Sequence, residues 1–246
     1  MSKASSAKHD LGKHWDRTGA RTYLQYADLV VVERKRIIAI LERLFAYHFQ
    51  RKKGLTMLDL GCGDGFVTEA IRSRYPDNVF YLMDGSKFMI EKARERLKNV
   101  DMIFLAETFE NYLNRSANVD KYDFIYSANA IHHLDFPEKR RLYSRVFDEL
   151  KAGGLFVNSD PVVPSSDRSE QWQFSLWTDW IRETAAECGL AIESELIERV
   201  PSDYKKKPEN KPSGLVEQLR LLEDIGFRDV DCFYKYGIFA LFGGTK

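Results

Sequence analysis

The sequence predicts a doubly wound α/β fold, with a mostly parallel seven-stranded sheet, helices on both faces, an antiparallel C-terminal hairpin and a helical cap. Three observations lead to this prediction. Short apolar runs alternate with amphipathic segments between residues 55 and 159, a glycine-rich turn follows the first of these runs, and two closely spaced apolar runs end the chain. Such alternation is typical of right-handed βαβ units, whose helices cover both faces of a parallel sheet.

The composition narrows the functional classes. The chain has 246 residues, 44% hydrophobic and 30% charged, which is enough apolar side chain for one sizeable domain with an insertion. Basic and acidic residues both number 37, so the chain has no net positive charge that would attract nucleic acid to its surface over long range. Three cysteines without a CxxC spacing favour neither disulfides nor a zinc site. We therefore expect no metal and a reducing, cytoplasmic location.

The first 50 residues are expected to form an arm followed by helix. Residues 1–14 are polar and lack the apolar core of an export signal, and no apolar run approaches the roughly 18 residues that span a bilayer. We expect residues 1 to about 20 to be a mobile arm. Apolar residues between Tyr23 and Phe49 recur at helical spacing, which predicts one long helix or two shorter ones.

The core is predicted over residues 51–161. Its apolar runs predict strands, and its amphipathic segments predict helices. For the helix at 137–150, nearby residues explain where the helix begins and where it ends. Pro137 suits a first helical turn, and Gly153 and Gly154 supply the freedom to turn into the next strand. The strands are expected at residues 55–60, 79–83, 102–105, 122–127 and 154–159, and the other helices at 66–74 and 86–97.

A helical cap is expected at residues 162–212, where the alternation breaks. Trp172, Leu176 and Trp180 recur at helical spacing, with Trp177 beside them, and this favours a helix packed on the core over an aromatic substrate cage. The polar run 205–212 is expected to be an exposed loop. Residues 213–246 then return to the core as a helix at 215–225 and a hairpin of strands at 228–235 and 237–243.

The most informative segment runs from Met57 to Phe66. Three glycines at alternate positions, 61, 63 and 65, follow a buried strand and let the backbone approach a ligand, while the next helix points free N–H groups at it. Asp84 ends the next strand, where it can accept hydrogen bonds from both ribose hydroxyls of a nucleoside. Asp59 adds a second carboxylate. Because Phe66 replaces the third glycine of GxGxxG, a nicotinamide site is disfavoured.

These motifs resemble those of class I S-adenosylmethionine-dependent methyltransferases, most closely the small-molecule type 11/12 domains. The resemblance covers roughly residues 50–160 and 221–244. It implies that S-adenosyl-L-methionine is the cofactor, with Gly61 and Gly63 at its methionine part, Asp84 at the ribose and Glu107 near the adenine amino group. The full predicted cofactor set is Asp59, Gly61, Cys62, Gly63, Asp84, Gly85, Met89, Ala106, Glu107 and Asn129. In this set Met89 and Ala106 would contact the adenine faces.

Two residues are candidates for the chemistry. His132 follows the fourth core strand and could take a proton from an attacking hydroxyl or amine, although a structural role at the strand end is an equal alternative. Asp160 ends the fifth core strand as a possible base or cap. Cys62 could be imagined as a nucleophile, but no partner base is placed by the sequence, and a small residue is what fits between two glycines.

The predicted function is transfer of a methyl group to a small-molecule acceptor by in-line displacement, with the segments before residue 50 and after 160 closing over the site. One alternative is a carboxy-S-adenosylmethionine synthase-like reaction, which needs a cationic pocket that Arg168 or Arg199 could supply. The other is a non-catalytic module that binds S-adenosylmethionine. The acceptor, and the choice between monomer and dimer, stay open, and we expect no membrane partner.

Overall fold

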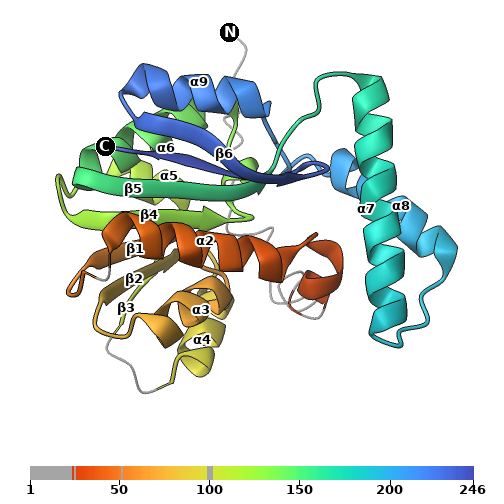
Figure 1. Cartoon of the computed structure of the whole chain (residues 1–246), viewed down its shortest axis with the longest axis horizontal. Helices are drawn as coiled ribbons and strands as arrows, with labels where there is room; N and C mark the ends of the chain where they lie inside the picture. The colour runs from red at the N-terminus through yellow and green to blue at the C-terminus, as the bar shows by residue number, and fades with distance from the viewer. Residues whose placement is uncertain (1–23, 25, 51, 99–101) are drawn as a thin grey trace, which may run out of the picture.

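The computed structural model describes residue 24 and residues 26–50, 52–98 and 102–246 (Figure 1). The expected N-terminal arm lies outside these residues. Within them, no helix has the length and apolar character needed to cross a membrane.

Seven strands form one sheet in the order β3-β2-β1-β4-β5-β7-β6. Strands β1 to β5 run parallel, and β7 lies antiparallel to both β5 and β6. The predicted fold class is therefore confirmed, including the C-terminal hairpin at the sheet edge. The strands are β1 (Thr56–Leu60), β2 (Val79–Asp84), β3 (Ile103–Ala106), β4 (Tyr122–Ala128), β5 (Leu150–Pro161), β6 (Arg228–Tyr236) and β7 (Phe239–Thr245).

Helices cover both faces of the sheet (Figure 1). Side chains of α2 (Arg34–Phe49), α3 (Phe66–Arg74) and α4 (Lys87–Arg96) pack in one core cluster, which includes Met57 of β1. Those of α5 (Phe109–Asn114), α6 (Phe136–Glu149) and α9 (Leu215–Ile225) pack in another, which includes Leu58. Neighbouring residues of β1 thus enter opposite clusters, as the two-residue period of a strand requires.

Local sequence explains most boundaries, with two departures. Helix α6 begins after Asp135, whose side chain and that of Glu138 form a capping box, with Pro137 in the first turn as predicted. Strand β5, however, already starts at Leu150, so Gly153 and Gly154 lie inside the strand rather than before it. Helix α5 was not predicted, because its six residues are too few to show a clear helical period.

The predicted cap consists of two helices, α7 (Asp167–Glu187) and α8 (Ser194–Lys206), which lie beyond the carboxyl ends of the strands (Figure 1). The buried face of α7 carries Trp177, Ile181 and Ala185, whereas Trp172 is 62% exposed. Of the stripe 172/176/180, Trp172 is therefore exposed, whereas Trp180 packs partly against the buried cluster. The exposed loop is also shorter than predicted, since α8 continues to Lys206 and only the residues after it leave the helix.

Candidate functional site

The glycine turn after β1 is held against the end of β2. The amide N–H groups of Gly61 and Cys62 both donate to the carbonyl oxygen of Met83, over 2.8 and 2.9 Å. Gly61 has a φ of 76°, and a Cβ at this position would stand 2.3 Å from the Cβ of Ala130. Only glycine meets both conditions, since L-residues rarely adopt positive φ and the Cβ of Ala130 is in the way. Gly63 also has positive φ, but no atom lies within 4 Å of its Cβ position.

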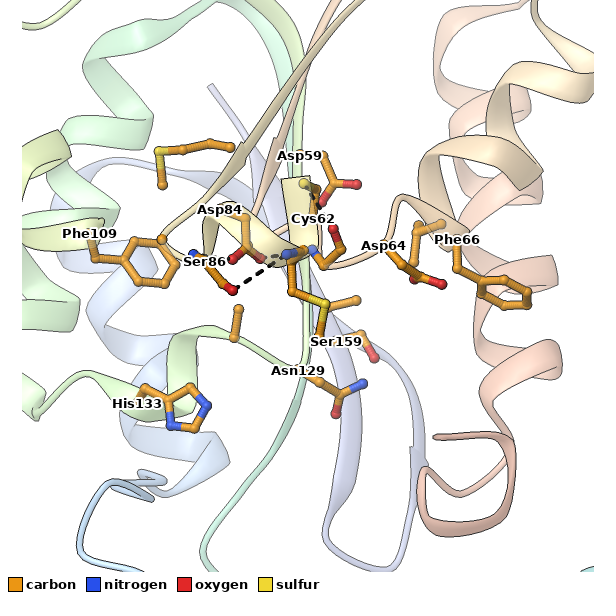
Figure 2. A pocket seen from close by; sticks show the side chains of 18 of the residues that line it. Asp59, Cys62, Asp64, Phe66, Asp84, Ser86, Phe109, Asn129, His133 and Ser159 are labelled. Atoms are coloured by element: carbon orange, nitrogen blue, oxygen red, sulfur yellow. Dashed lines mark hydrogen bonds between the residues drawn. The ribbon is translucent and has the colours of Figure 1, made fainter. Parts of the chain in front are cut away.

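Asp84 joins this turn to the start of α4. Its two carboxylate oxygens accept hydrogen bonds from the amide N–H of Gly63, over 2.9 Å, and of Ser86, over 2.8 Å. Burial raises the pKa of this carboxyl, while the two backbone donors act against the rise. Figure 2 shows Asp84 and Cys62 near the middle of the cavity, with Phe66 and Phe109 on opposite sides. Each carboxylate oxygen retains a lone pair for a ligand.

Asp59 lies beneath the turn and is only 2% exposed. It accepts a hydrogen bond from the Thr68 hydroxyl over 2.7 Å, and Thr68 is in turn 2.7 Å from the Tyr126 hydroxyl. Burial raises the pKa of Asp59 to about 7, with a smaller contribution from the nearby charge of Asp84. This carboxyl therefore changes charge near neutral pH.

Cys62 is buried in the same turn. Burial, together with the charge of Asp84, raises the pKa of its thiol well above the usual value. Because the thiolate is the reactive form, the environment disfavours a nucleophilic role and agrees with the reading of Cys62 as a small residue between glycines.

Nine of the ten predicted cofactor residues line one cleft at the carboxyl ends of β1, β2 and β4; they are Asp59, Gly61, Cys62, Gly63, Asp84, Gly85, Met89, Glu107 and Asn129. Ala106 does not line this cleft, because it lies on the exposed end of β3. Asn129 adopts a φ of 54°, and its amide N–H donates to the carbonyl oxygen of Ser159 over 2.8 Å. Glu107 forms an ion pair with Arg115 at 3.2 Å.

Several cleft residues were missed by sequence reasoning. Arg34 comes from α2; its guanidinium lies 4.0 Å from the centre of the Phe66 ring and pairs with Asp28 over 2.7 Å. No local motif marks Arg34, because its place depends on how α2 packs against α3. The position of Phe66 could have been recognised from the sequence, because it is the first residue of the helix that follows the glycines. The other missed residues are Val31, Ile37, Ile38, Val67, Met83, Ser86, Thr108, Phe109, Ser159 and Glu209.

The two predicted catalytic residues contact each other. Nδ1 of His132 lies 2.6 Å from Oδ1 of Asp160, and the two side chains are 8% and 2% exposed. If Asp160 is ionised, this contact favours the tautomer with a proton on Nδ1 and an acceptor lone pair on Nε2. The sequence had presented them as separate candidates, because they follow different strands.

His132 lines a second cavity, a chamber of about 1040 Å³ between the cap and the strand ends. Its wall comes from residues 26–31, from the 3₁₀ helix Ile131–His133, from α7 and α8, and from Phe239 of β7. Val31, Asn129, His133 and Glu209 line both the cleft and the chamber. The two cavities therefore adjoin, and segments before residue 50 and after 160 contribute to the wall of the chamber.

Lys139 holds the loop around His132 in place. Its ammonium donates to the carbonyl oxygens of Leu134 and Lys211 and to the hydroxyl of Ser213. The amide N–H of Lys211 donates back to the carbonyl oxygen of His132 over 2.7 Å. Burial lowers the pKa of Lys139 to about 8, although the charge of Asp160 partly opposes this. This lysine was not predicted, since two of its three partners, Lys211 and Ser213, lie more than 70 residues away along the chain.

Comparisons with known proteins agree with this architecture. Residues 57–154 match a family model described as a methyltransferase domain. Malonyl-(acyl-carrier protein) O-methyltransferase 1 of Ilyobacter polytropus is 32% identical over 142 residues, 57% of this chain and 48% of the relative. A carboxy-S-adenosyl-L-methionine synthase of Nautilia profundicola is 20% identical over 195 residues, 77% of this chain and 76% of the relative. The chain spans about half the length of the malonyl-(acyl-carrier protein) relatives that it matches.

Solved structures share the fold. Human N-acetylserotonin methyltransferase, determined in complex with S-adenosylmethionine, superposes with a TM-score of 0.61 at 16% identity, covering 98% of this chain and 59% of the other. Residues 57–154 therefore contain a methyltransferase domain, and S-adenosylmethionine is the cofactor that this domain uses.

Proposed function

We propose that the protein transfers a methyl group from S-adenosylmethionine to a small molecule bound in the chamber. The observation that carries this proposal is the shared lining: Val31, Asn129, His133 and Glu209 line both the cofactor cleft and a chamber large enough for an organic acceptor. An acceptor bound beside these four residues would therefore lie next to the cofactor, and the sheet would not have to move to bring the two together.

The cleft fits the cofactor by its own chemistry. The open space at the Cβ position of Gly63 leaves room for the methionine part beside Gly61, and the lone pairs of Asp84 suit the ribose hydroxyls, as the resemblance implies. Met89 and Phe109 offer apolar contact beside Glu107 for the adenine. The buried Asp59 lies where a negative charge would favour a cationic cofactor. When bound, S-adenosylmethionine supplies an electrophilic methyl carbon on a sulfonium sulfur.

His132 and Asp160 are proposed as the pair that removes a proton from the acceptor. Bound S-adenosylmethionine would supply the methyl group to the acceptor oxygen and would leave as S-adenosylhomocysteine, with the electron pair of the former carbon–sulfur bond on sulfur. The hydroxyl proton passes to Nε2 of His132. Asp160 would hold the imidazole in the required tautomer and stabilise its charged form.

The test is release of S-adenosylhomocysteine from a panel of small-molecule acceptors. With an acceptor found, His132→Ala is expected to lower kcat by about 10²- to 10⁴-fold, the usual contribution of a general base, while S-adenosylhomocysteine binds as before. His48→Ala is the matched control, because His48 contacts the carbonyl oxygen of Gly153, at the opposite end of β5. An unchanged kcat in His132→Ala would remove the base from the proposal, and absence of turnover with every acceptor would count against methyl transfer.

A second candidate function is synthesis of a carboxylated cofactor, because the similarity to the Nautilia profundicola synthase covers 77% of the chain. The site offers little for it. Neither Arg168 nor Arg199 lines the two cavities, and the lysines and arginines among the described wall residues are Arg34, already paired with Asp28, and Lys207. Mass spectrometry of the cofactor after incubation with prephenate distinguishes the reactions, since only the synthase would add the mass of a carboxyl group.

A further inference from the structure

The chamber wall is mainly apolar. Trp177, Ile181, Ile197 and Phe239 are each at most 6% exposed and belong to one packed cluster. The remaining apolar wall residues are Leu29, Val30, Val31, Pro161, Ala191, Ile192, Leu196 and Val200. A wall of this kind binds the apolar body of a ligand, and a few polar groups then fix its orientation.

One polar group of this wall has no partner. The Tyr204 hydroxyl is buried, and no atom of the described residues makes a hydrogen bond with it. Its ring packs 5.6 Å from the ring of Trp177 and 6.1 Å from that of His132. Burial also raises the pKa of Tyr204, which keeps the hydroxyl protonated and able to donate. A buried hydroxyl without a partner is costly, so this one suits a ligand atom beside His132.

The charged groups of the wall argue against an anionic acceptor. Lys207 is the one lysine or arginine among the described wall residues, and Glu193, Asp203 and Glu209 are also there. A carboxylate or phosphate would lose its hydration on entering the chamber, and the wall does not carry enough positive charge to compensate for this cost. A carboxylate would also have no proton for the His132–Asp160 pair to remove.

We infer that the chamber takes a neutral, largely apolar acceptor with one hydroxyl group, and that Tyr204 donates a hydrogen bond to the oxygen of this hydroxyl. The inference rests on the proposed function and adds the substrate class and a specificity-determining residue on the cap. Tyr204 holds the oxygen from one side while Nε2 of His132 receives its proton. The donor also favours the negative charge that develops on the oxygen.

Two probes with the same ring system test the class: 1-naphthol, which carries a hydroxyl, and 1-naphthoate, which carries a carboxylate. Binding is measured by calorimetry with the full chain saturated with S-adenosylhomocysteine. We expect 1-naphthol to bind at least tenfold more tightly than 1-naphthoate. Equal affinities, tighter binding of 1-naphthoate, or no binding of either probe would overturn the assigned class.

The variant Tyr204→Phe tests the residue. It should weaken binding of 1-naphthol about fivefold to tenfold, the usual loss for one hydrogen bond, and leave binding of 1-naphthoate and S-adenosylhomocysteine unchanged. Tyr236→Phe is the matched control, because Tyr236 packs against Trp180 in the same cluster but does not line the chamber. Unweakened binding of 1-naphthol to Tyr204→Phe would overturn its role. Failure of the wild-type chain to bind S-adenosylhomocysteine would instead refute the proposed function.

Discussion

The proposed cofactor cleft and the proposed acceptor chamber are built in different ways. The central part of the cleft is backbone, because the amides of Gly61, Cys62 and Gly63 are bonded to groups at the end of β2. The chamber is made of side chains from segments far apart in the chain, joined by contacts such as the hydrogen bond from Trp177 Nε1 to the carbonyl oxygen of Val30. Substitutions in the cleft should therefore act through backbone geometry with large effects, and those in the cap through packing with graded effects.

The largest expected effect is that of Gly61→Ala, which would destroy the geometry of the turn. Positive φ costs an L-residue about 1–2 kcal/mol, and the contact of the new Cβ with Ala130 adds about 1–3 kcal/mol. We expect a loss of about 2–5 kcal/mol in the free energy of unfolding, measured by urea denaturation. Gly63→Ala is the control for conformation alone and should lose only about 1–2 kcal/mol. Equal losses in both variants would mean that the close approach to Ala130 is unimportant.

The next effect concerns binding. Asp84→Ala removes the acceptor of the Gly63 and Ser86 amides and the proposed ribose contacts. It should weaken S-adenosylmethionine binding by about 2–4 kcal/mol if both ribose bonds are charge-assisted. Calorimetry gives the affinity, and Asp77→Ala serves as control, because Asp77 is exposed and pairs with Lys53. Unaltered affinity in Asp84→Ala would refute the assignment to the ribose.

Asp59 should make stability depend on pH. Its pKa of about 7 in the folded state lies above the usual 3.8 of an aspartate, so the folded state holds a proton that the unfolded state releases. The contribution of this proton to the free energy of unfolding is complete below pH 4 and is lost as the pH rises through 7. Relative to Asp59→Asn, the wild-type chain should lose about 2 kcal/mol between pH 5 and pH 7, at 1.36 kcal/mol per unit. If the free energy of unfolding changed with pH by the same amount in both proteins, Asp59 would not titrate in this range.

The smallest effect is expected at the surface of the cap. Arg182 of α7 and Glu198 of α8 form an ion pair at 2.6 Å, but their side chains are 47% and 57% exposed. Exposed pairs contribute little, so Arg182→Ala should change the free energy of unfolding by less than about 1 kcal/mol. Ile181→Ala, which removes a side chain only 1% exposed, should cost about 2–5 kcal/mol. If Arg182→Ala were the more costly change, surface charge rather than packing would hold the cap.

The cleft was largely predictable from sequence, whereas the chamber was not. The turn was recognised because three glycines at alternate positions and an aspartate at the next strand end are local features of one βαβ unit. The cap was recognised as helical, but the packed face of α7 was misassigned. Trp172 and Trp177 are equally apolar in the sequence, and only the fold decides which of them faces Val32 and Ile238.

The sequence by itself determined the sheet, the positions of most helices and the glycine turn, because strand and helix periods and glycine conformations depend on near neighbours in the chain. Tertiary structure alone decided that His132 meets Asp160, that Lys139 holds residues 211–213 beside them, and that Tyr204, which lines the chamber, has a buried hydroxyl without a partner among the described residues. These contacts join segments separated by 28 to more than 70 residues. They arise only when packing of the whole chain fixes where each segment lies.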